Sequence, residues 1–459
     1  MAGIGFELRR IFGRKTLASQ IWGSVYATMS TVGPSVLFAV LMLGLTAIME
    51  HFGATELEKM FFISSFTYIF MMAILLSAVL NTALSRYISD CVFERREHEL
   101  CASMFGTLAL GSVVSGLLTF GLCAAMYWKD GIPIGFLLVY YWLGVLGTNA
   151  YHLITYVSAL KQYKEVTFSY FAGMLVAFAV FWLSYRCFAA HLIMATYLAL
   201  AAGFLVTDLF LVFWCVKAFG WPEGRYFRFI SYVKKYPKLI ISGNAYMIGF
   251  YISSIIYWFL SDLGTQVSIF RTAPTYDMAM FLAIAVNMSA LVLFVVKTET
   301  AFYDKYVGYL SALNTGAYDA IEDARVSMSQ TLHLQLFFVY EVQLVITVLL
   351  IFLLNVVFPY FNIGAQVLNI FMPLGMGVYC TLCMYFTVVF LYYFEDHTGA
   401  CIGPVVFLAV VTAGALIASR AGGVWYPFPL LAGGVAGWII SFILLKRRLK
   451  NLNACLMCR

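Results

Sequence analysis

Long apolar stretches, separated by short polar or charged segments, make up most of the chain. A helix needs about 20 mostly apolar residues to cross a bilayer, and each stretch is of that order. Barrel strands would instead alternate polar and apolar residues. The pattern predicts twelve spans, at roughly 20–48, 60–85, 103–127, 134–160, 167–185, 192–216, 239–261, 268–296, 333–357, 366–394, 399–419 and 424–445. The chain is therefore expected to be an all-α, multi-pass membrane protein.

The composition agrees with this expectation. Of the 459 residues, 63% are hydrophobic and only 11% are charged, whereas a soluble domain carries about 25% charged residues. So few charged side chains cannot cover a water-facing surface. The composition therefore excludes a soluble enzyme, a disordered chain and a nucleic-acid-binding protein.

The positions of the basic residues predict the orientation in the membrane, because membrane proteins concentrate Lys and Arg in cytoplasmic loops. With a cytoplasmic N-terminus, the twelve spans place nearly all of the 28 basic residues on the cytoplasmic side. The exceptions, which would lie outside, are Lys59, Lys129, Arg186, Arg271 and Arg420. Both termini are therefore expected to be cytoplasmic, and we expect no cleaved signal peptide.

The spans divide into two halves of six. Residues 20–216 are expected to form one helix bundle and residues 239–445 a second, joined by a basic cytoplasmic linker, 217–238. The end segments 1–19 and 446–459 would be cytoplasmic. Because both halves start in the cytoplasm, an axis relating them would run along the membrane normal.

The segment 297–330 is the longest connection within the second half. Its first part has an apolar stripe at helical spacing, which predicts an amphipathic cytoplasmic helix on the membrane surface. The stripe consists of Phe302, Tyr306, Tyr309, Leu310 and Leu313, and Gly316 would end the helix. A plain solvated connector is the alternative.

The water-exposed segments are too short for a catalytic domain, which needs about 50–200 residues. The sequence contains no P-loop, G-x-S-x-G or H-E-x-x-H motif. We therefore expect neither enzyme activity nor a cofactor. Two C-x-x-C pairs, Cys380–Cys383 and Cys455–Cys458, would lie at different depths, whereas tetrahedral zinc needs four ligands together, so we expect no metal site.

Ionisable residues inside spans are costly and are functional candidates. Asp208 lies midway along the sixth predicted span with no basic residue nearby in sequence, and Glu341 lies about two turns into the ninth. Each is predicted to serve a substrate path or ion coupling, with a packing role as the alternative. Arg271 and Asp277, near the outer end of the eighth span, would line an exit vestibule or form an interfacial ion pair.

Uncharged polar and aromatic side chains are more numerous within the spans. No Lys or Arg lies in the middle of a predicted span, which disfavours a cargo whose phosphates need fixed cations. Amide groups and aromatic rings suit a neutral, hydroxyl-rich cargo such as a saccharide. The candidates are Asn149, His152, Asn244, Tyr246, Phe250 and Tyr257, with Asn287 and Ser289 in the eighth span. The alternative is that such groups join neighbouring helices or anchor the membrane interface.

Helix-breaking residues recur inside the spans, where a carrier that alternates access can bend. The predicted hinges, with static kinks as the alternative, are Gly33, Pro34, Pro274 and Pro373. The linker 217–238 is a candidate surface for a partner protein or for anionic lipid. Its candidate contacts are Arg225, Arg228, Lys234 and Lys235.

The N-terminus adds a specific signal. Residues 1–10 read MAGIGFELRR, and residues 30–34 read STVGP. These segments resemble the Pel exopolysaccharide transporter family, usually called PelG, of the multidrug/oligosaccharidyl-lipid/polysaccharide (MOP) exporter superfamily. The rest of the chain is similar to that family in length, span count and basic central loop. The resemblance implies two six-helix bundles that face each other across a central cavity, as in MATE transporters.

The resemblance also implies a function and partners. Such a protein would export the Pel polymer, rich in N-acetylgalactosamine or related hexosamines, across the cytoplasmic (inner) membrane. Its partners would be a separate cytosolic glycosyltransferase, membrane proteins that include a cyclic-di-GMP-binding regulator, and membrane lipids. Three alternatives stay open: a lipid-linked oligosaccharide flippase, a cation-coupled multidrug antiporter, and a non-conducting scaffold of a polysaccharide synthase complex.

Overall fold

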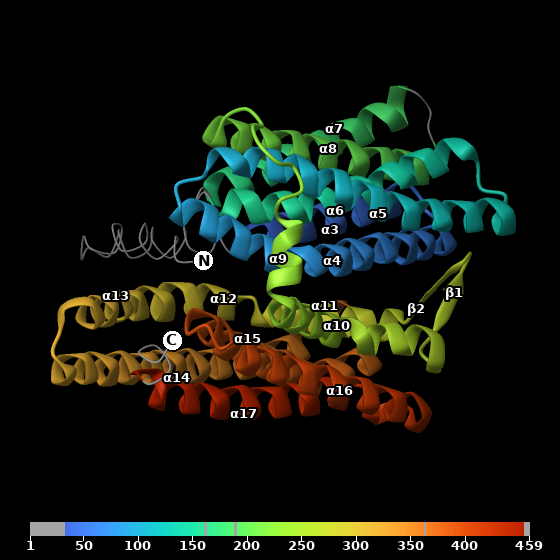
Figure 1. Cartoon of the computed structure of the whole chain (residues 1–459). Helices are drawn as coiled ribbons and strands as arrows, with labels where there is room; N and C mark the ends of the chain where they lie inside the picture. The colour runs from blue at the N-terminus through green and yellow to red at the C-terminus, as the bar shows by residue number, and fades with distance from the viewer. Residues whose placement is uncertain (1–32, 160–162, 188–190, 362–363, 454–459) are drawn as a thin grey trace, which may run out of the picture. The chain divides into compact units, whose positions relative to one another are not determined.

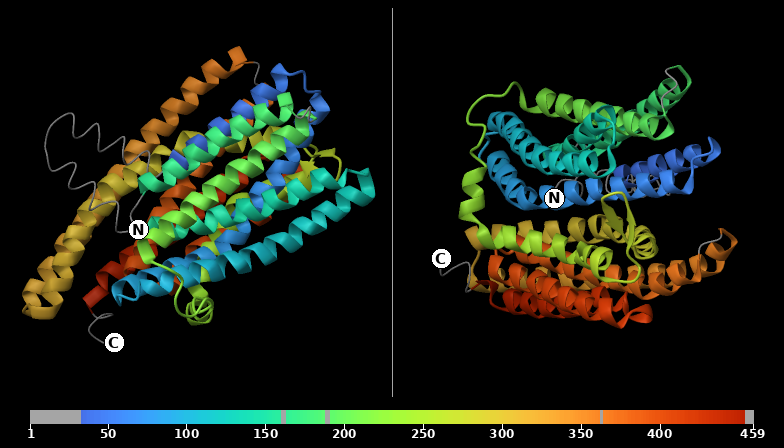
Figure 2. Two further views of the ribbon diagram at one scale, coloured as in Figure 1. Left: turned by 90° about the horizontal axis from the view of Figure 1, so that it is seen from above. Right: turned by 90° about the vertical axis from the view of Figure 1, so that its right-hand side faces the viewer.

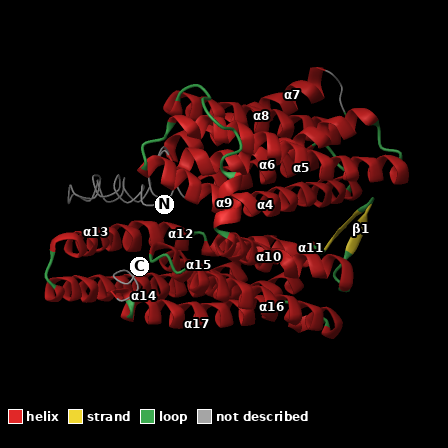
Figure 3. Ribbon diagram, in the orientation of Figure 1, coloured by secondary structure: helices red, strands yellow, loops and turns green. Residues whose placement is uncertain are grey.

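The computed structural model describes residues 33–159, 163–187, 191–361 and 364–453. Within these ranges nearly every residue is helical, and the strands form a single two-stranded hairpin (Figure 3). Twelve of the described helical segments are long and apolar enough to cross a membrane. Helices satisfy their own backbone N–H and C=O groups, as the bilayer core requires. The predicted all-α multi-pass fold is therefore confirmed.

The described residues form two compact units. The first contains residues 33–240 and 266–271, and the second contains residues 241–265 and 272–453. The predicted linker 217–238 is thus part of the first unit. The chain passes between the units at 240–241 and again on each side of the hairpin tip.

The helices of the first unit extend, in most cases, beyond the predicted spans. They are α3 (Gly33–His51), α4 (Glu56–Phe93), α5 (His98–Asp130), α6 (Ile134–Ala159), α7 (Tyr163–Cys187), α8 (Leu192–Phe219) and the short α9 (Ile230–Lys235) (Figure 1). A capping box starts α4, because the Glu58 N–H donates to the Thr55 hydroxyl at 3.2 Å and the Thr55 N–H donates to the Glu58 carboxylate at 2.8 Å.

Aromatic side chains fill the interior of the first unit. Toward the N-terminal end of α4, Phe62 and Tyr140 are fully buried, and Phe270 of the hairpin tip packs in the same cluster. Toward the C-terminal end of α4, a second cluster contains the fully buried Tyr87 and Tyr156. Burial of these large rings is expected to supply much of the unit's packing energy.

Helices α7 and α8 lie side by side along their length (Figures 1 and 2). They approach closely because two glycines face each other. A side-chain carbon at Gly173 would lie 2.6 Å from the Gly203 carbonyl oxygen, and one at Gly203 would lie 2.9 Å from the Gly173 carbonyl oxygen. Such contacts at small residues are typical of membrane helices. This contact fixes the part of α8 that carries Asp208.

The second unit is built around α15. Its elements are α10 (Pro237–Leu260), β1 (Thr265–Val267), β2 (Phe270–Thr272), α11 (Pro274–Asn287), α12 (Ser289–Leu293), the π-helix η1 (Phe294–Glu299), α13 (Thr300–Thr315), α14 (Tyr318–Val357), the 3₁₀-helix η2 (Phe358–Phe361), α15 (Ala365–Tyr393), α16 (His397–Ala421), the 3₁₀-helix η3 (Gly423–Trp425) and α17 (Phe428–Lys450). The first residues of α10, up to 240, and the hairpin tip, 266–271, belong to the first unit. Of the most apolar stretch of α15, 89% is buried inside the protein, because α11, α14, α16 and α17 pack around this helix.

The start of the eighth span differs from the prediction. The residues before Pro274 form the β1–β2 hairpin, and Pro274 is the first residue of α11. Proline suits this position, because the first turn of a helix does not use its N–H groups internally. The Asp277 carboxylate accepts the free Ala273 N–H at 3.2 Å. Pro274 therefore starts a helix and does not kink one.

The segment 297–330 contains α13 and the start of α14. Helix α13 follows η1 without a loop, and α13 and α14 run side by side past the ends of α15 and α17 (Figures 1 and 2). Two residues of the predicted stripe pack inward, because Phe302 and Tyr309 are fully buried. The Phe302 ring contacts the rings of Phe390 and Phe394 at the end of α15. These two rings thus cover the protein's own core, whereas Leu310 of the same stripe is exposed. The position of this helix on a membrane surface stays a prediction.

The other predicted hinges are Pro373 in α15 and the Gly33–Pro34 pair in α3. Pro373 lies inside α15, where it removes one backbone hydrogen bond. Gly33 and Pro34 are the first described residues of α3, and the earlier part of the predicted first span lies outside the described residues. Bending at these positions stays a prediction.

Candidate functional site

A buried carboxyl group without a hydrogen-bond partner distinguishes the first unit. Asp208 lies in the middle of α8 and is 7% exposed. Neither of its carboxyl oxygens has a hydrogen-bond partner among the described residues. Buried polar groups normally have partners, because burying them alone costs free energy. Asp208 is therefore a carboxyl group, buried inside the first unit, whose charge a bound proton or cation would neutralise.

A cluster of amide, hydroxyl and imidazole groups joins α4, α5 and α6 in the same unit. The Asn149 amide donates to the Ser112 hydroxyl at 2.9 Å, and His152 Nδ1 lies 3.1 Å from Asn81 Oδ1. The Asn149 carbonyl oxygen is buried and has no hydrogen-bond partner in the part of the chain that the structure describes. The structure thus brings together the predicted Asn149 and His152. Asn81 and Ser112 were missed, although each is a polar residue within an apolar run.

A second polar network lies in the second unit, where α11 ends. The Asn287 amide donates to the Gly375 carbonyl oxygen at 3.0 Å, and its own oxygen accepts from the Thr347 hydroxyl at 2.9 Å. Gln343 extends the chain, donating to Thr347 at 3.1 Å and accepting from Ser289 at 2.9 Å. Each group has a partner, so this network joins helices α11, α12, α14 and α15 and is suited to packing.

The aromatic candidates of α10 face other rings of the second unit. The Tyr246 ring lies 6.2 Å from Phe250 and 5.1 Å from Tyr385 of α15. Tyr257 is fully buried, and its hydroxyl donates to the Tyr426 carbonyl oxygen at 2.9 Å. Asn244 is half-buried on the same helix. The Tyr246 and Phe250 rings therefore lie next to each other, whereas the Tyr257 hydroxyl has its own buried contact.

The remaining ionisable candidates differ in their surroundings. Glu341 is exposed on α14, while Gln343 two residues later is buried. The Asp277 carboxylate accepts from the Trp258 indole N–H at 2.9 Å as well as from the Ala273 backbone. The exposed Arg271 is held by its backbone, because the Tyr68 hydroxyl accepts its N–H at 3.1 Å and donates to its carbonyl oxygen at 3.0 Å.

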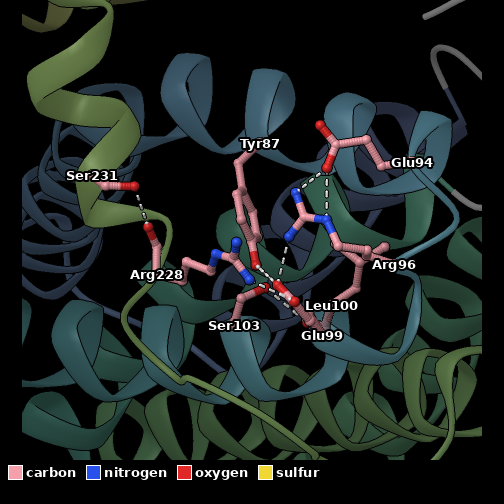
Figure 4. Close-up of polar contacts among 8 residues, drawn as sticks. All are labelled: Tyr87, Glu94, Arg96, Glu99, Leu100, Ser103, Arg228 and Ser231. Carbon is pink, nitrogen blue, oxygen red and sulfur yellow. Dashed lines mark hydrogen bonds and ion pairs between the residues drawn. The ribbon is translucent and has the colours of Figure 1, made fainter.

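The predicted docking linker is attached to the end of the first unit through Glu99 of α5 (Figure 4). The Glu99 carboxylate accepts from Arg228 of the linker at 2.6 Å, from Arg96 at 2.8 Å and from the Tyr87 hydroxyl at 3.3 Å. Hydrogen bonding to Glu94 raises the pKa of Arg96, so its guanidinium stays charged. Sequence reasoning missed Glu99, because it lies outside the predicted spans among other charged residues.

The linker backbone also packs directly on α5. A side-chain carbon at Gly106 would lie 2.0 Å from the Tyr226 carbonyl oxygen, so only glycine allows this approach. Of the four candidate contacts, Arg228 is thus engaged within the unit, whereas Arg225 and Lys234 are exposed. The Lys235 ammonium lies over the Tyr236 ring at 5.2 Å. Burial raises the pKa of Tyr232 to about 12, with a further contribution from Asp90, so this hydroxyl stays neutral.

Within the described residues, no group of three or more His, Cys, Asp or Glu side chains could hold a metal ion. Cys380 and Cys383 are buried free thiols of α15. Cys455 and Cys458 lie outside the described residues.

The sequence matches the model of one protein family over residues 1–456, and that family is described as "PelG: Putative exopolysaccharide Exporter (EPS-E)". No curated protein matches the chain in sequence.

Several solved structures have a similar fold. An outward-facing multidrug resistance MATE family transporter of the MOP superfamily has a TM-score of 0.66 and 12% identity, over 94% of this chain and 96% of that one. A MOP superfamily transporter from Pyrococcus furiosus has a TM-score of 0.66 and 11% identity over the same shares. The Vibrio cholerae MATE transporter VcmN in its bent form has a TM-score of 0.61 and 13% identity, over 94% and 97%. At these identities the likeness shows a shared MATE/MOP fold.

Proposed function

We propose that this chain, which belongs to the PelG family of exopolysaccharide exporters, carries a Pel-type polymer rich in N-acetylated hexosamines across the cytoplasmic membrane. The observation that carries this proposal is the family match, which extends over residues 1–456. The twelve apolar helices and the transporter fold support a membrane exporter. The absence of Lys and Arg from the middle of the predicted spans favours a neutral, hydroxyl-rich cargo over a phosphate-linked one.

Asp208 is the residue that we assign to coupling. A carboxylate that is buried without a partner gains more from a bound proton or cation than a hydrogen-bonded one does. Uptake and release of that charge would change the packing of α8 against α7. Asn149 and His152, with Asn81 and Ser112, offer hydrogen-bonding groups for sugar hydroxyls in the same unit.

The linker is our candidate surface for the cytosolic glycosyltransferase, with a cyclic-di-GMP-binding membrane regulator as a further partner. Trp221 is 81% exposed and Phe227 is 53% exposed. The exposed cations Arg225 and Lys234 lie on the same segment. Aromatic residues and Arg are enriched at the centres of protein interfaces. Because Glu99 and Gly106 hold the linker on α5, this surface would be presented in one fixed position.

The test replaces Asp208 by Asn in the producing cell and measures polymer in the medium and polymer retained in cells. We expect secreted polymer to fall at least about tenfold while the purified membranes still transfer sugar to polymer. Glu97→Gln is the matched control, because it removes a carboxylate at an exposed position. Unchanged secretion in Asp208→Asn would exclude Asp208 from coupling. Full secretion without the chain would exclude export as its function.

The unpartnered Asp208 also favours a second candidate, a cation-coupled antiporter for small molecules. The two are separated by loading inverted vesicles with a fluorescent cationic dye and imposing a proton or sodium gradient. Gradient-dependent dye movement that Asp208→Asn abolishes would favour the antiporter. No dye movement, together with loss of polymer secretion, would favour the polysaccharide exporter.

A further inference from the structure

A groove with basic walls lies between α14 and α17 of the second unit, apart from the residues assigned to transport. Its volume is about 650 Å³. Its cationic side chains are Arg325 of α14 and Lys446, Arg447 and Lys450 of the last turns of α17. The charge distribution predicts this end of the unit to be cytoplasmic.

Of the four cations that line the groove, only Arg325 takes part in the contacts of the described residues that hold α14 and α17 together. The Arg325 guanidinium donates to the Leu449 carbonyl oxygen at 2.8 Å and to the Glu322 carboxylate at 2.9 Å, which joins α14 to α17. Glu322 also accepts from the Asn453 amide at 2.7 Å, and Asn453 accepts from the Tyr309 hydroxyl at 2.8 Å. The Glu322 carboxylate is therefore already engaged by Arg325.

The other three cations are available for a ligand. Lys446, Arg447 and Lys450 are exposed, and none has an ion-pair or hydrogen-bond partner within the described residues. Three uncompensated positive charges on adjacent turns of one helix repel one another, and an anion between them would remove that repulsion.

The side of the groove toward the membrane is apolar. Phe442 and Ile443 line it one turn before the cations. Exposed apolar side chains continue from there along both helices, with Ile439 52% exposed on α17 and Leu334 70% exposed on α14. A helix rises about 1.5 Å per residue, so the cations lie only about 6 Å from the apolar strip.

We propose that this groove binds the phosphodiester headgroup of an anionic phospholipid, with an acyl chain along the apolar strip. Basic pockets between membrane helices on the cytoplasmic side bind anionic headgroups. The planar guanidinium of Arg447 can bind two phosphate oxygens at once, and the lysines add point charges on either side. A free phosphate would use the cations but would leave the apolar strip uncovered, so the lipid makes more of the available contacts.

The test measures lipid retained by the purified full chain. The protein is delipidated and exchanged into nanodiscs of phosphatidylcholine that contain a small fraction of cardiolipin or phosphatidylglycerol. The anionic lipid molecules that stay bound to each protein are then counted by native mass spectrometry. The variant Lys446→Gln/Arg447→Gln/Lys450→Gln removes the three cations. The control Arg95→Gln/Lys305→Gln/Arg420→Gln removes three exposed cations that lie outside the groove and the linker. A second variant, Ile443→Glu, places a negative charge on the apolar strip.

We expect the groove variant to weaken anionic lipid binding at least about tenfold, since each basic residue near the surface contributes measurably to attraction. Ile443→Glu should weaken it as well, and the three-cation control should bind as the unchanged chain does. An equal loss in the groove variant and the control would overturn the proposal, as would no loss in either. If inorganic phosphate at constant ionic strength displaces the lipid, the ligand of the groove is a free phosphate, and the lipid proposal is overturned.

Discussion

Glu99 of α5 and Arg228 of the linker form an ion pair of 2.6 Å across 129 residues of sequence (Figure 4). The Glu99 side chain is 12% exposed and the Arg228 side chain is 44% exposed. The pair therefore joins a largely buried acceptor to a surface segment. It turns a linker that looks free in the sequence into part of the first unit.

Replacing Glu99 by Gln should release the linker. The variant loses the charge that holds both Arg228 and Arg96, and hydrogen bonds to charged groups contribute about 1.5–3 kcal/mol. We expect a loss of about 1–2 kcal/mol, because Arg228 is partly exposed. Limited trypsin digestion should cut residues 225–238 several times faster. Glu94→Gln is the control, because Glu94 is 52% exposed and pairs with Arg96 but not with Arg228. Equal cleavage of both variants would show that Glu99 does not hold the linker on the first unit.

Replacing Gly106 by Ala should have a similar effect by a steric route. The new carbon would lie 2.0 Å from the Tyr226 carbonyl oxygen, and a backbone atom cannot move aside cheaply. Overpacking of this kind costs about 1–3 kcal/mol. The melting temperature in detergent should fall by several degrees. Gly121→Ala in the same helix meets nothing within 4 Å and should not lower it. Equal melting temperatures would show that the linker does not pack on α5.

Replacing Tyr68 by Phe should loosen the hairpin tip. One hydroxyl both accepts the Arg271 N–H and donates to the Arg271 carbonyl oxygen. Losing both bonds should cost about 1 kcal/mol, which corresponds to amide exchange about fivefold faster. Hydrogen–deuterium exchange of peptides covering 265–272 measures this change. Tyr127→Phe, at an exposed position of α5, should leave the rate as it is.

Replacing Asn287 by Ala should destabilise the second unit. The Gly375 carbonyl oxygen and the Thr347 hydroxyl would each lose a buried partner, and an unsatisfied buried group costs about 1–3 kcal/mol. Intrinsic tryptophan fluorescence during heating should show a lower melting temperature. Asn314→Ala, at an exposed position of α13, removes the same amide without a buried partner. A decrease of equal size in both variants would mean that the network contributes nothing.

Local hydrophobicity was enough to predict the twelve spans. A helix that crosses a bilayer must be apolar over about 20 residues, whatever its neighbours are, so each span is visible in its own residues. The same reasoning found Asp208, because a lone carboxyl group in such a run is costly wherever the helix lies. The segment before Pro274 was predicted as part of a span, because its hairpin depends on contacts with α4 that lie far away in the sequence.

The contacts between helices depended on the folded arrangement. Phe302 and Tyr309 have the spacing of a surface helix, and contacts with distant segments, such as that of Phe302 with Phe390 of α15, make them part of the core. Asn149 and His152 acquired their partners Ser112 and Asn81 in the same way. Hydrophobic periodicity shows which face of a helix avoids water, but lipid and protein are both apolar. The choice between them is made by side-chain packing across distant segments, which no local pattern encodes.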